Sequence, residues 1–374
     1  MKTFDVYPLY PVEPIRGLGC KLWDRDGNEY LDFYGGHAVI SVGHTHPYYV
    51  NFISNQLRNL GFYSNSVQNK LQNDLAELLG VVSEYPSYSL FMCNSGAEAN
   101  ENALKLASFH TGKSKVIAFS NSFHGRTSGA VACTNNPNII APFNANHNVE
   151  FVRWNDIAGV KESIEKGDVA AVIIEGIQGV GGINVPDKTF FQELSKVCVN
   201  NGVILIVDEV QSGYGRTGKF FAHQFFDITP DLITVAKGMG NGFPVGGVLV
   251  NPKFTAKHGM LGTTFGGNHL ACAASIAVLN IIVNESLIGN AKEIGDYLVT
   301  SLKTIRGVKD IRGLGLMVGA EFDFTVSDIR KKLLFDKGVF TGYSGTNVIR
   351  LLPPLCVSKT HVDFLIDSLN QVIP

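Results

Sequence analysis

Unbroken runs of Val, Ile and Leu alternate with helical patterns through the middle of the chain. Apolar runs of this length are typical of strands that are buried on both faces of a parallel sheet. Four of them lie at residues 89–93, 115–119, 169–174 and 203–207. A helical pattern at 193–199 separates the last two runs, so we expect a βαβ unit with a right-handed crossover. An Ala-rich helical pattern from Ala97 to about Phe109 follows the first run, and together these elements predict an α/β core.

The pattern changes after about Val283, where shorter helical and strand segments are mixed. We predict helices at 288–305, 327–336 and 359–372 and strand segments at 310–323 and 348–352. The first 45 residues have strand and turn character, with a hairpin turn at Trp23–Gly27. We therefore expect an amino-terminal segment that belongs to a small domain (1–45), a large domain (46–284) and the α+β remainder of the small domain (285–374).

Composition narrows the classes of protein that the chain can represent. With 31 Lys and Arg against 33 Asp and Glu in 374 residues, the net charge is -2, which argues against a nucleic-acid binder. No apolar run reaches the roughly 18 residues of a membrane helix, and the first residues lack the pattern of a signal peptide. Six cysteines without a Cys-x-x-Cys pair favour a reducing compartment. We expect a soluble, cytoplasmic protein without nucleic-acid or membrane partners.

The first of three polar motifs is Asn-Ser-Gly-Ala-Glu-Ala-Asn at residues 94–100, where a buried strand ends and a helix begins. Small residues there let backbone N–H groups and the helix dipole approach a phosphate closely. The alternative is an ordinary helix cap, because Ser95 and Glu98 have the spacing of a capping box. Taken alone, this motif favours the cap.

Asp208 and Lys237 stand at the ends of two further apolar strands. Asp208 can face a cationic group of a ligand, although a turn cap or a metal ligand is the alternative. Lys237 enters a Gly-rich turn, and an amine leaving a buried strand has a lowered pKa and a higher nucleophilicity unless it extends to solvent. A phosphate site, a carboxylate and a nucleophilic lysine at one sheet edge are what pyridoxal 5'-phosphate (PLP) requires. Lys237 would form the Schiff base, and Asp208 would pair with the pyridinium nitrogen.

These motifs, in this order, resemble the class III aminotransferases, and most closely the branch of that family that acts on acetylornithine and N-succinylornithine. The resemblance extends from residues 16–24 to residues 351–355 and covers nearly the whole chain. It rests on five motifs in register, at Asn94–Ala99, Phe123–Thr127, Asp208–Gln211, Ala236–Gly238 and Gly262–Asn268. It implies an aspartate aminotransferase-like fold of type I, with a mostly parallel central sheet flanked by helices, which binds PLP, and a smaller α+β domain.

The resemblance also implies roles for individual residues. Lys237, Asp208 and Phe123 would be catalytic, with Phe123 stacked on the pyridine ring. The cofactor would contact Ser95, Gly96, Ala97, Phe123, Asp208, Gln211, Lys237 and, from the neighbouring subunit, Thr264. The substrate would contact Arg126, Thr263, Glu175 and Arg350, with the two arginines binding carboxylates. Because Thr264 is expected to reach the other subunit's cofactor, the resemblance implies a homodimer with shared active sites.

The activity that the resemblance implies is transfer of the δ-amino group of an N2-acylornithine, acetylated or succinylated, to 2-oxoglutarate. The products would be an N-acylglutamate 5-semialdehyde and glutamate, in arginine biosynthesis. Lys237 would move a proton between the substrate carbon and the cofactor as base and acid in a ping-pong reaction. An ornithine or other ω-amino acid aminotransferase is the alternative.

One motif departs from the family's usual Glu-Pro-Ile-Gln-Gly-Glu. Residues 175–180 read Glu-Gly-Ile-Gln-Gly-Val, so Gly176 replaces the proline and Val180 replaces the second glutamate. In ω-aminotransferases that glutamate is the residue that neutralises the arginine matching Arg350. We hypothesise that Val180 marks a chain that does not prefer free ornithine as its substrate. The unusual segment Gly35–Val39, which we expect near the entrance for the substrate, is the second observation behind this hypothesis.

The remaining histidines and one arginine have simpler interpretations. His44 and His46 have no recognisable set of metal ligands near them, so we expect a structural turn rather than a zinc site. His124, beside Phe123, is expected to support the residues that contact the ligand, and a catalytic role is the alternative. Arg312 is predicted to be a turn residue of the terminal domain.

Overall fold

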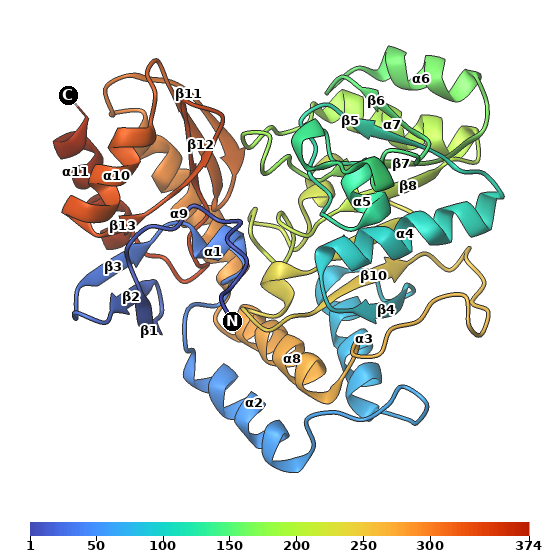
Figure 1. Ribbon diagram of the computed structural model, residues 1–374, viewed down its shortest axis with the longest axis horizontal. Coiled ribbons are helices and arrows are strands. Elements are labelled where there is room, and N and C mark those ends of the chain that lie inside the picture. Colours follow the sequence, from blue (N-terminus) through green and yellow to red (C-terminus); the bar gives the residue numbers. More distant parts are fainter. Residues whose placement is uncertain (374) are drawn as a thin grey trace.

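The computed structural model describes residues 1–373 and is built around a seven-stranded sheet, drawn on the right in Figure 1. Its strands, in the order β4-β10-β9-β8-β7-β5-β6, are Ser89–Cys93, Gly246–Val250, Leu232–Val235, Ile204–Asp208, Val169–Glu175, Lys115–Phe119 and Val149–Val152. Strand β10 is antiparallel to both of its neighbours, and the other pairs are parallel. Every residue of β7 and β8 is buried, which explains why both strands are apolar up to their last residues, Glu175 and Asp208.

Helices cover both faces of this sheet. Ala171 and Ile173 of β7 pack with the alanines of α4 (Gly96–Thr111), whereas Val172 and Ile174 pack with α6 (Ile157–Glu165) and α7 (Lys188–Asn200). Successive side chains of a strand point to opposite faces, so α4 lies on one face and α6 and α7 on the other. The short α5 (Ser128–Ala132) packs on α4, and α2 (Pro47–Asn59), α3 (Lys70–Ser83) and the largely buried α8 (His269–Asn284) pack together.

The two ends of the chain share a second region, blue and orange to red on the left of Figure 1. Strands β1 (Pro14–Leu18), β2 (Lys21–Asp24) and β3 (Glu29–Asp32) form a sheet with β13 (Val339–Phe340). Strands β11 (Val308–Leu314), β12 (Met317–Phe322), β15 (Val348–Leu351) and β14 (Gly342–Ser344) form an antiparallel sheet. The other elements are α1 (Gly35–Ala38), α9 (Leu287–Leu302), α10 (Ser327–Lys337), α11 (Lys359–Val372) and the 3-10 helices Pro137–Ile139, Pro142–Asn144, Ala222–Phe226 and Lys237–Met239. The domain boundaries at 45/46 and 284/285 stay a prediction.

The predicted α/β fold with a mostly parallel sheet is confirmed, and two local predictions need correction. Helix α7 begins at Lys188 rather than at residue 193, because its first turns bury Phe190 and Phe191. Arg312 is not a turn residue. It lies inside β11, since the turn of this hairpin falls later, between Leu314 and Met317.

Within residues 1–373, no single helix is long and apolar enough to cross a membrane. Helices α8 and α9 pass that test of length and composition only as a pair, which is bent by 64°.

Candidate active site

A cavity of about 410 Å³ opens at the carboxyl ends of the parallel strands. Strands β4, β7, β8 and β9 each deliver residues to it where they end, as expected for a ligand crevice in an α/β sheet. Most of the predicted site residues line it: Ser95, Gly96, Ala97, Phe123, Arg126, Glu175, Asp208, Gln211 and Lys237. The fold thus brings together side chains that are widely separated in the sequence.

The amino terminus of α4 forms one wall of the cavity. Ser95 is the N-cap, and its Oγ accepts a hydrogen bond of 3.1 Å from the Glu98 N–H. The Glu98 carboxylate does not complete the predicted capping box, because it accepts the N–H of Asn94 at 2.6 Å instead of that of Ser95. The N–H groups of the first helical turn have no carbonyl acceptor one turn earlier, so this end of the helix can bind an anion. A Cβ added at Gly96 would lie 2.6 Å from Cγ1 of Val210, so only glycine fits there.

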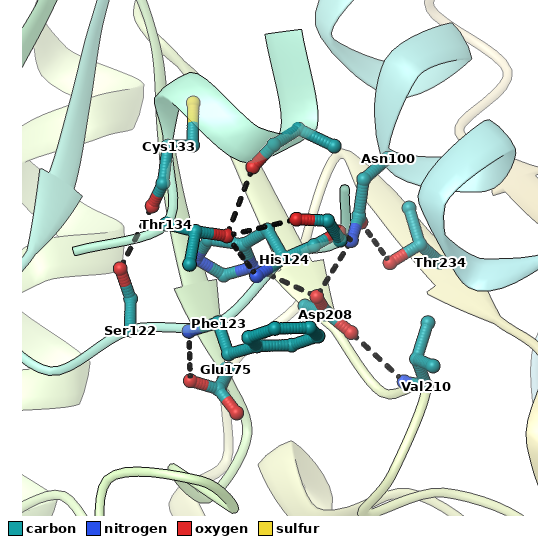
Figure 2. Close-up of polar contacts among 12 residues, drawn as sticks. Asn100, Ser122, Phe123, His124, Cys133, Thr134, Glu175, Asp208, Val210 and Thr234 are labelled. Carbon is teal, nitrogen blue, oxygen red and sulfur yellow. Dashed lines mark hydrogen bonds and ion pairs between the residues drawn. The ribbon is translucent and has the colours of Figure 1, made fainter. Parts of the chain in front are cut away.

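Asp208 is held at the end of β8 by a buried polar network, shown in Figure 2. Its Oδ2 accepts a hydrogen bond from Nδ2 of Asn100 at 2.7 Å and lies 2.8 Å from Nδ1 of His124. Its Oδ1 accepts the Val210 N–H at 3.0 Å. Thr234 fixes Asn100 in turn, because its hydroxyl donates to Oδ1 of Asn100 at 2.7 Å. Asp208 is 4% exposed, and these hydrogen bonds hold its carboxylate in one orientation in the wall of the cavity.

Lys237 follows β9 with a left-handed backbone, at a φ of 41°. Non-glycine residues in this region are uncommon and often occur at functional sites. Burial lowers the pKa of Lys237 from 10.5 to about 8, an effect that the charges of Asp208 and Glu175 oppose and that of Arg350 adds to. An amine with this pKa is neutral in a useful fraction of molecules near neutral pH, which makes it nucleophilic.

Glu175 closes β7 and connects two loops of the site. Its Oε1 accepts the Phe123 N–H at 3.1 Å, and its Oε2 accepts the Gly179 N–H at 2.9 Å. Burial raises the pKa of Glu175 to about 7, and the Asp208 charge adds to that effect while His124 opposes it. The side chain therefore positions Phe123 and the loop that leads to Val180, in addition to lining the cavity.

Gln211 lines the cavity and contacts the first turn after β3. Its Nε2 donates to the carbonyl oxygen of His37 at 3.2 Å, and its Oε1 is buried without a partner within the described residues. The turn itself, α1, is left-handed at all four positions, with φ values of 56°, 55°, 69° and 63° at Gly35, Gly36, His37 and Ala38. A buried acceptor without a donor is costly unless a ligand satisfies it.

The two predicted carboxylate-binding arginines occupy different environments. Arg126 is exposed and lines the cavity. Arg350 lies in β15, is 5% exposed and does not line the cavity. Its Nε donates to the Tyr343 carbonyl at 2.8 Å, whereas its buried Nη1 has no partner among residues 1–373. Burial lowers the pKa of Arg350.

Thr263 and Thr264 do not line the cavity of their own chain. The Thr263 hydroxyl accepts hydrogen bonds from Nδ2 of Asn94 at 3.3 Å and from the Gly266 N–H at 3.1 Å. Thr264 is exposed. The structure therefore does not bring these two threonines to the site that Lys237 and Asp208 form.

Val180 lines the cavity and is 45% exposed. The antiparallel sheet that contains β11 and β14 holds its loop, because the Ser344 hydroxyl donates to the Val180 carbonyl at 2.6 Å and Nε of Arg312 donates to the Gly182 carbonyl at 2.8 Å. Arg312 also pairs with Asp310 at 2.8 Å and with Glu321 at 2.7 Å. Arg312 thus holds the loop that contains Val180 through its hydrogen bond to Gly182, and it is not a turn residue.

His44 and His46 contact different carboxylates. Nε2 of His44 lies 2.9 Å from Oδ2 of Asp32, and Nε2 of His46 lies 2.8 Å from Oε1 of Glu285. Both pairings are long-range contacts that tie the turn to other elements.

Sequence reasoning missed Asn100 and Thr234 as parts of the site. Each is a buried polar residue in an otherwise apolar surface, Asn100 among the alanines of α4 and Thr234 in β9. A buried polar group needs a partner, so this interruption of an apolar face was the signal that could have identified them.

Comparison with known proteins identifies the family. A family model described as "Aminotransferase class-III" matches residues 6–373. Acetylornithine aminotransferase of Bacillus subtilis is 41% identical over 378 residues, which cover 99% of this chain and 97% of that protein. The protein of the same name from Methanothermobacter thermautotrophicus is 40% identical over 377 residues, covering 99% and 95%. The chain belongs to the class-III aminotransferase family.

Solved structures agree with this assignment. Ornithine aminotransferase of Toxoplasma gondii ME49 has a TM-score of 0.93 and 28% identity, over 99% of this chain and 91% of that one. A further structure of the Toxoplasma gondii enzyme, with a TM-score of 0.90 and 29% identity over 98% of this chain and 90% of that one, has partial occupancy of PLP at its active site. The chain is therefore an aminotransferase with the fold of PLP-dependent enzymes.

Proposed function

We propose that this aminotransferase uses PLP to transfer the δ-amino group of an N2-acylornithine to 2-oxoglutarate, producing an N-acylglutamate 5-semialdehyde and glutamate. The observation that carries the proposal is that Lys237, Asp208 and the amino terminus of α4 line one cavity. The acylated substrate is supported by relatives at about 40% identity over nearly the whole chain, which are named acetylornithine aminotransferases. Such a reaction serves arginine biosynthesis, and the six free thiols suit a cytoplasmic enzyme.

The residues of the cavity fit PLP. The Ser95–Ala97 turn offers free N–H groups to a phosphate, and a Cβ at Gly96 would collide with Val210, which keeps this position a glycine. The partnerless Oε1 of Gln211 suits a hydroxyl donor, Asp208 suits a protonated ring nitrogen, and Phe123 offers an aromatic face. Lys237 is the amine that would hold the cofactor. When bound, PLP supplies the aldehyde that takes the amino group and a ring that accepts electrons from the substrate carbon.

The chain's own groups then perform binding and proton transfer. Asn100 and His124 keep the Asp208 carboxylate in one orientation, so that it can favour a positive charge on the ring. The Lys237 amine, with its pKa of about 8, can take a proton from the substrate carbon and return one. Glu175 holds Phe123 through its backbone N–H.

Substrate recognition rests on the two arginines and on Val180. Arg126 lines the cavity. Arg350 lies outside the cavity lining, but its charge acts on Lys237 and its buried Nη1 has no partner among the described residues. Both arginines are therefore suited to carboxylates, which both 2-oxoglutarate and an acylornithine carry. Free ornithine has an α-ammonium group that would need a carboxylate partner, whereas an acylated nitrogen is neutral. The apolar Val180 offers no such partner. The chain should therefore prefer acylated substrates, and the carboxylate of a succinyl tail is compatible with the exposed Arg126.

The proposed enzyme is a homodimer whose cavities are completed by residues of the partner subunit. Thr264 is exposed and lies beside Phe265, whose ring packs on Phe62 with centroids 5.6 Å apart. Both rings are exposed large hydrophobic groups. An exposed apolar patch next to a polar residue that has no role in its own cavity is typical of an interface.

Borohydride trapping tests the assignment of Lys237. The purified protein should show a visible absorbance band that borohydride removes, and peptide mapping of the reduced protein should find the added pyridoxyl group on Lys237. Lys237→Ala should lack the band and lose turnover, whereas Lys161→Ala, which removes an exposed lysine paired with Glu193, should behave as the native chain. Full turnover by Lys237→Ala would refute the assignment.

A further inference from the structure

Two cysteines that the catalytic proposal does not use lie against each other. The Sγ atoms of Cys20 and Cys356 are 3.5 Å apart, although the residues are separated by 336 positions. Cys20 precedes β2, and Cys356 follows β15. The other cysteines, all within the described residues, have no thiol neighbour at hydrogen-bonding distance: Cys93, Cys133, Cys198 and Cys272. The fold therefore singles out one pair of thiols.

The surroundings give the two thiols different reactivity. Cys20 is 3% exposed, whereas Cys356 is only partly buried and can meet a small oxidant. A hydrogen bond from Cys20 lowers the pKa of Cys356, and the same contact, together with burial, raises the pKa of Cys20. The buried guanidinium of Arg216 favours a thiolate at both positions. Cys356 thus has the features of an attacking thiol and Cys20 those of a resolving one.

The pair also adjoins the contacts that support the active site. The Cys20 carbonyl accepts the Asp32 N–H at 2.8 Å, and the Leu355 N–H, one residue before Cys356, donates to the Ser41 carbonyl at 2.7 Å. The Ser41 hydroxyl donates to the Gly238 carbonyl at 2.8 Å, directly after Lys237. A disulfide between the two cysteines would join the segment before β2 covalently to the segment after β15, and both segments contact residues that support the cavity.

We infer that Cys20 and Cys356 form a reversible thiol–disulfide site that hydrogen peroxide oxidises. The Cys356 thiolate attacks the peroxide bond, which breaks to leave a sulfenic acid on Cys356 and, after protonation, one molecule of water. The Cys20 thiol then attacks that sulfur, the S–S bond forms, and the hydroxyl leaves as a second molecule of water. Two electrons pass from the thiols to the peroxide. The sulfur atoms must approach from 3.5 Å to about 2.05 Å.

Mass spectrometry of the full-length holoprotein tests this inference. After brief exposure to hydrogen peroxide, alkylation and digestion, we expect a linked peptide that contains Cys20 and Cys356, and dithiothreitol should remove it. The protein should stay monomer-sized in a denaturing gel without reductant, and the other four cysteines should remain free for alkylation after unfolding. Fully alkylatable Cys20 and Cys356, or a disulfide between two chains, would overturn the inference.

Two variants assign the roles within the pair. In Cys20→Ser, Cys356 should be oxidised without a link, to sulfenic or sulfinic acid. In Cys356→Ser, Cys20 should stay reduced, because it is buried and its pKa is raised. The reverse assignment of oxidation would contradict the inference.

Unfolding in urea provides a readout that does not depend on turnover. A link across 336 positions restricts the unfolded chain, so the oxidised protein should have a higher unfolding midpoint than the reduced protein. Cys20→Ser should show no difference between peroxide-treated and reduced samples. A lower midpoint for the linked protein would mean that the reduced structure is not preformed for the bond, and it would overturn the inference.

Discussion

The reactivity of Lys237 depends on where the chain places the amine rather than on the residue type. The neighbouring strand ends bury it, and two carboxylates, Asp208 and Glu175, keep part of its affinity for a proton. Without those carboxylates burial would lower the pKa further. The balance leaves an amine that can be neutral for attack and charged for proton donation within a narrow pH range.

The pH dependence of cofactor capture tests this balance. The rate at which the apoprotein takes up PLP should rise with pH as the Lys237 amine loses its proton, and it should level off above about 8. Stopped-flow absorbance over a pH series measures it. Asp208→Asn removes a charge that raises the pKa, so its profile should level off at lower pH. A rate that still rises near the ordinary value of 10.5 would contradict the proposed environment.

Individual site residues were predictable to different degrees. Asp208 and Lys237 could be identified because each interrupts the end of an apolar run, and a strand end is where a ligand crevice forms. Asn100 and Thr234 were missed: each interrupts an apolar face, but the hydrogen bond that gives them their role joins residues 134 positions apart and is visible only in the fold. Arg350 was predicted to bind a carboxylate, but its burial and its free Nη1 emerge only from the packing of β15.

At the scale of elements, the junction of β4 and α4 contributes the anion site. The helix can begin at Gly96 because Ser95 caps it from one side, and the Glu98 carboxylate is drawn to Asn94 instead of covering the first turn. The end of β8 approaches so closely that Val210 leaves no room for a side chain at Gly96. The N–H groups of the first turn therefore remain free for a ligand, whereas a methyl group at Gly96 would not fit.

Gly96→Ala tests the role of this junction. The new Cβ would lie 2.6 Å from Cγ1 of Val210, so the strand end or the helix must shift, and PLP affinity should fall at least about tenfold, or roughly 1.4 kcal/mol. Titration of the apoprotein with PLP measures it. Gly289→Ala is the matched control, because a Cβ added at this position of α9 would meet no atom within 4 Å beyond its own helix backbone. It should leave affinity unchanged while stabilising the helix by about 0.5–1 kcal/mol. Equal affinities for both variants would contradict the proposed anion site.

Prediction of the elements worked best where burial was uniform. Strands β7 and β8 were evident as apolar runs, whereas the start of α7 and the position of Arg312 were placed wrongly. Both errors concern the ends of elements, where the local sequence pattern is weak and tertiary contacts determine which residue is the first or the last. The antiparallel insertion of β10 between β4 and β9 also lies beyond what local patterning can indicate.

At the scale of the whole molecule, the first and last segments of the chain pack against each other. Strands β1 to β3 form one sheet with β13, and Cys20 meets Cys356, so the first and last segments jointly support the cavity. The sequence predicted that the first 45 residues belong with the terminal region. It could not predict this pairing register, because β13 is two residues long and carries almost no pattern.

The proposed dimer gives a prediction at the same scale. Phe265 is 61% exposed, and Phe265→Asp would place a charge in the apolar patch that it forms with Phe62, so light scattering should find monomers with little activity. Phe364→Asp is the matched control, because Phe364 is 48% exposed on α11, away from that patch, and the variant should remain dimeric and active. A dimeric, active Phe265→Asp variant would place the interface elsewhere.

The central claim is that the enzyme transfers the δ-amino group of acylated ornithine to 2-oxoglutarate. Its most direct test is a comparison of kcat/KM for N-acetylornithine, N-succinylornithine and free ornithine, with 2-oxoglutarate as the acceptor. We expect at least one acylated donor to exceed free ornithine by about tenfold or more, since Val180 offers no carboxylate to an α-ammonium group. A clear preference for free ornithine would contradict the claim.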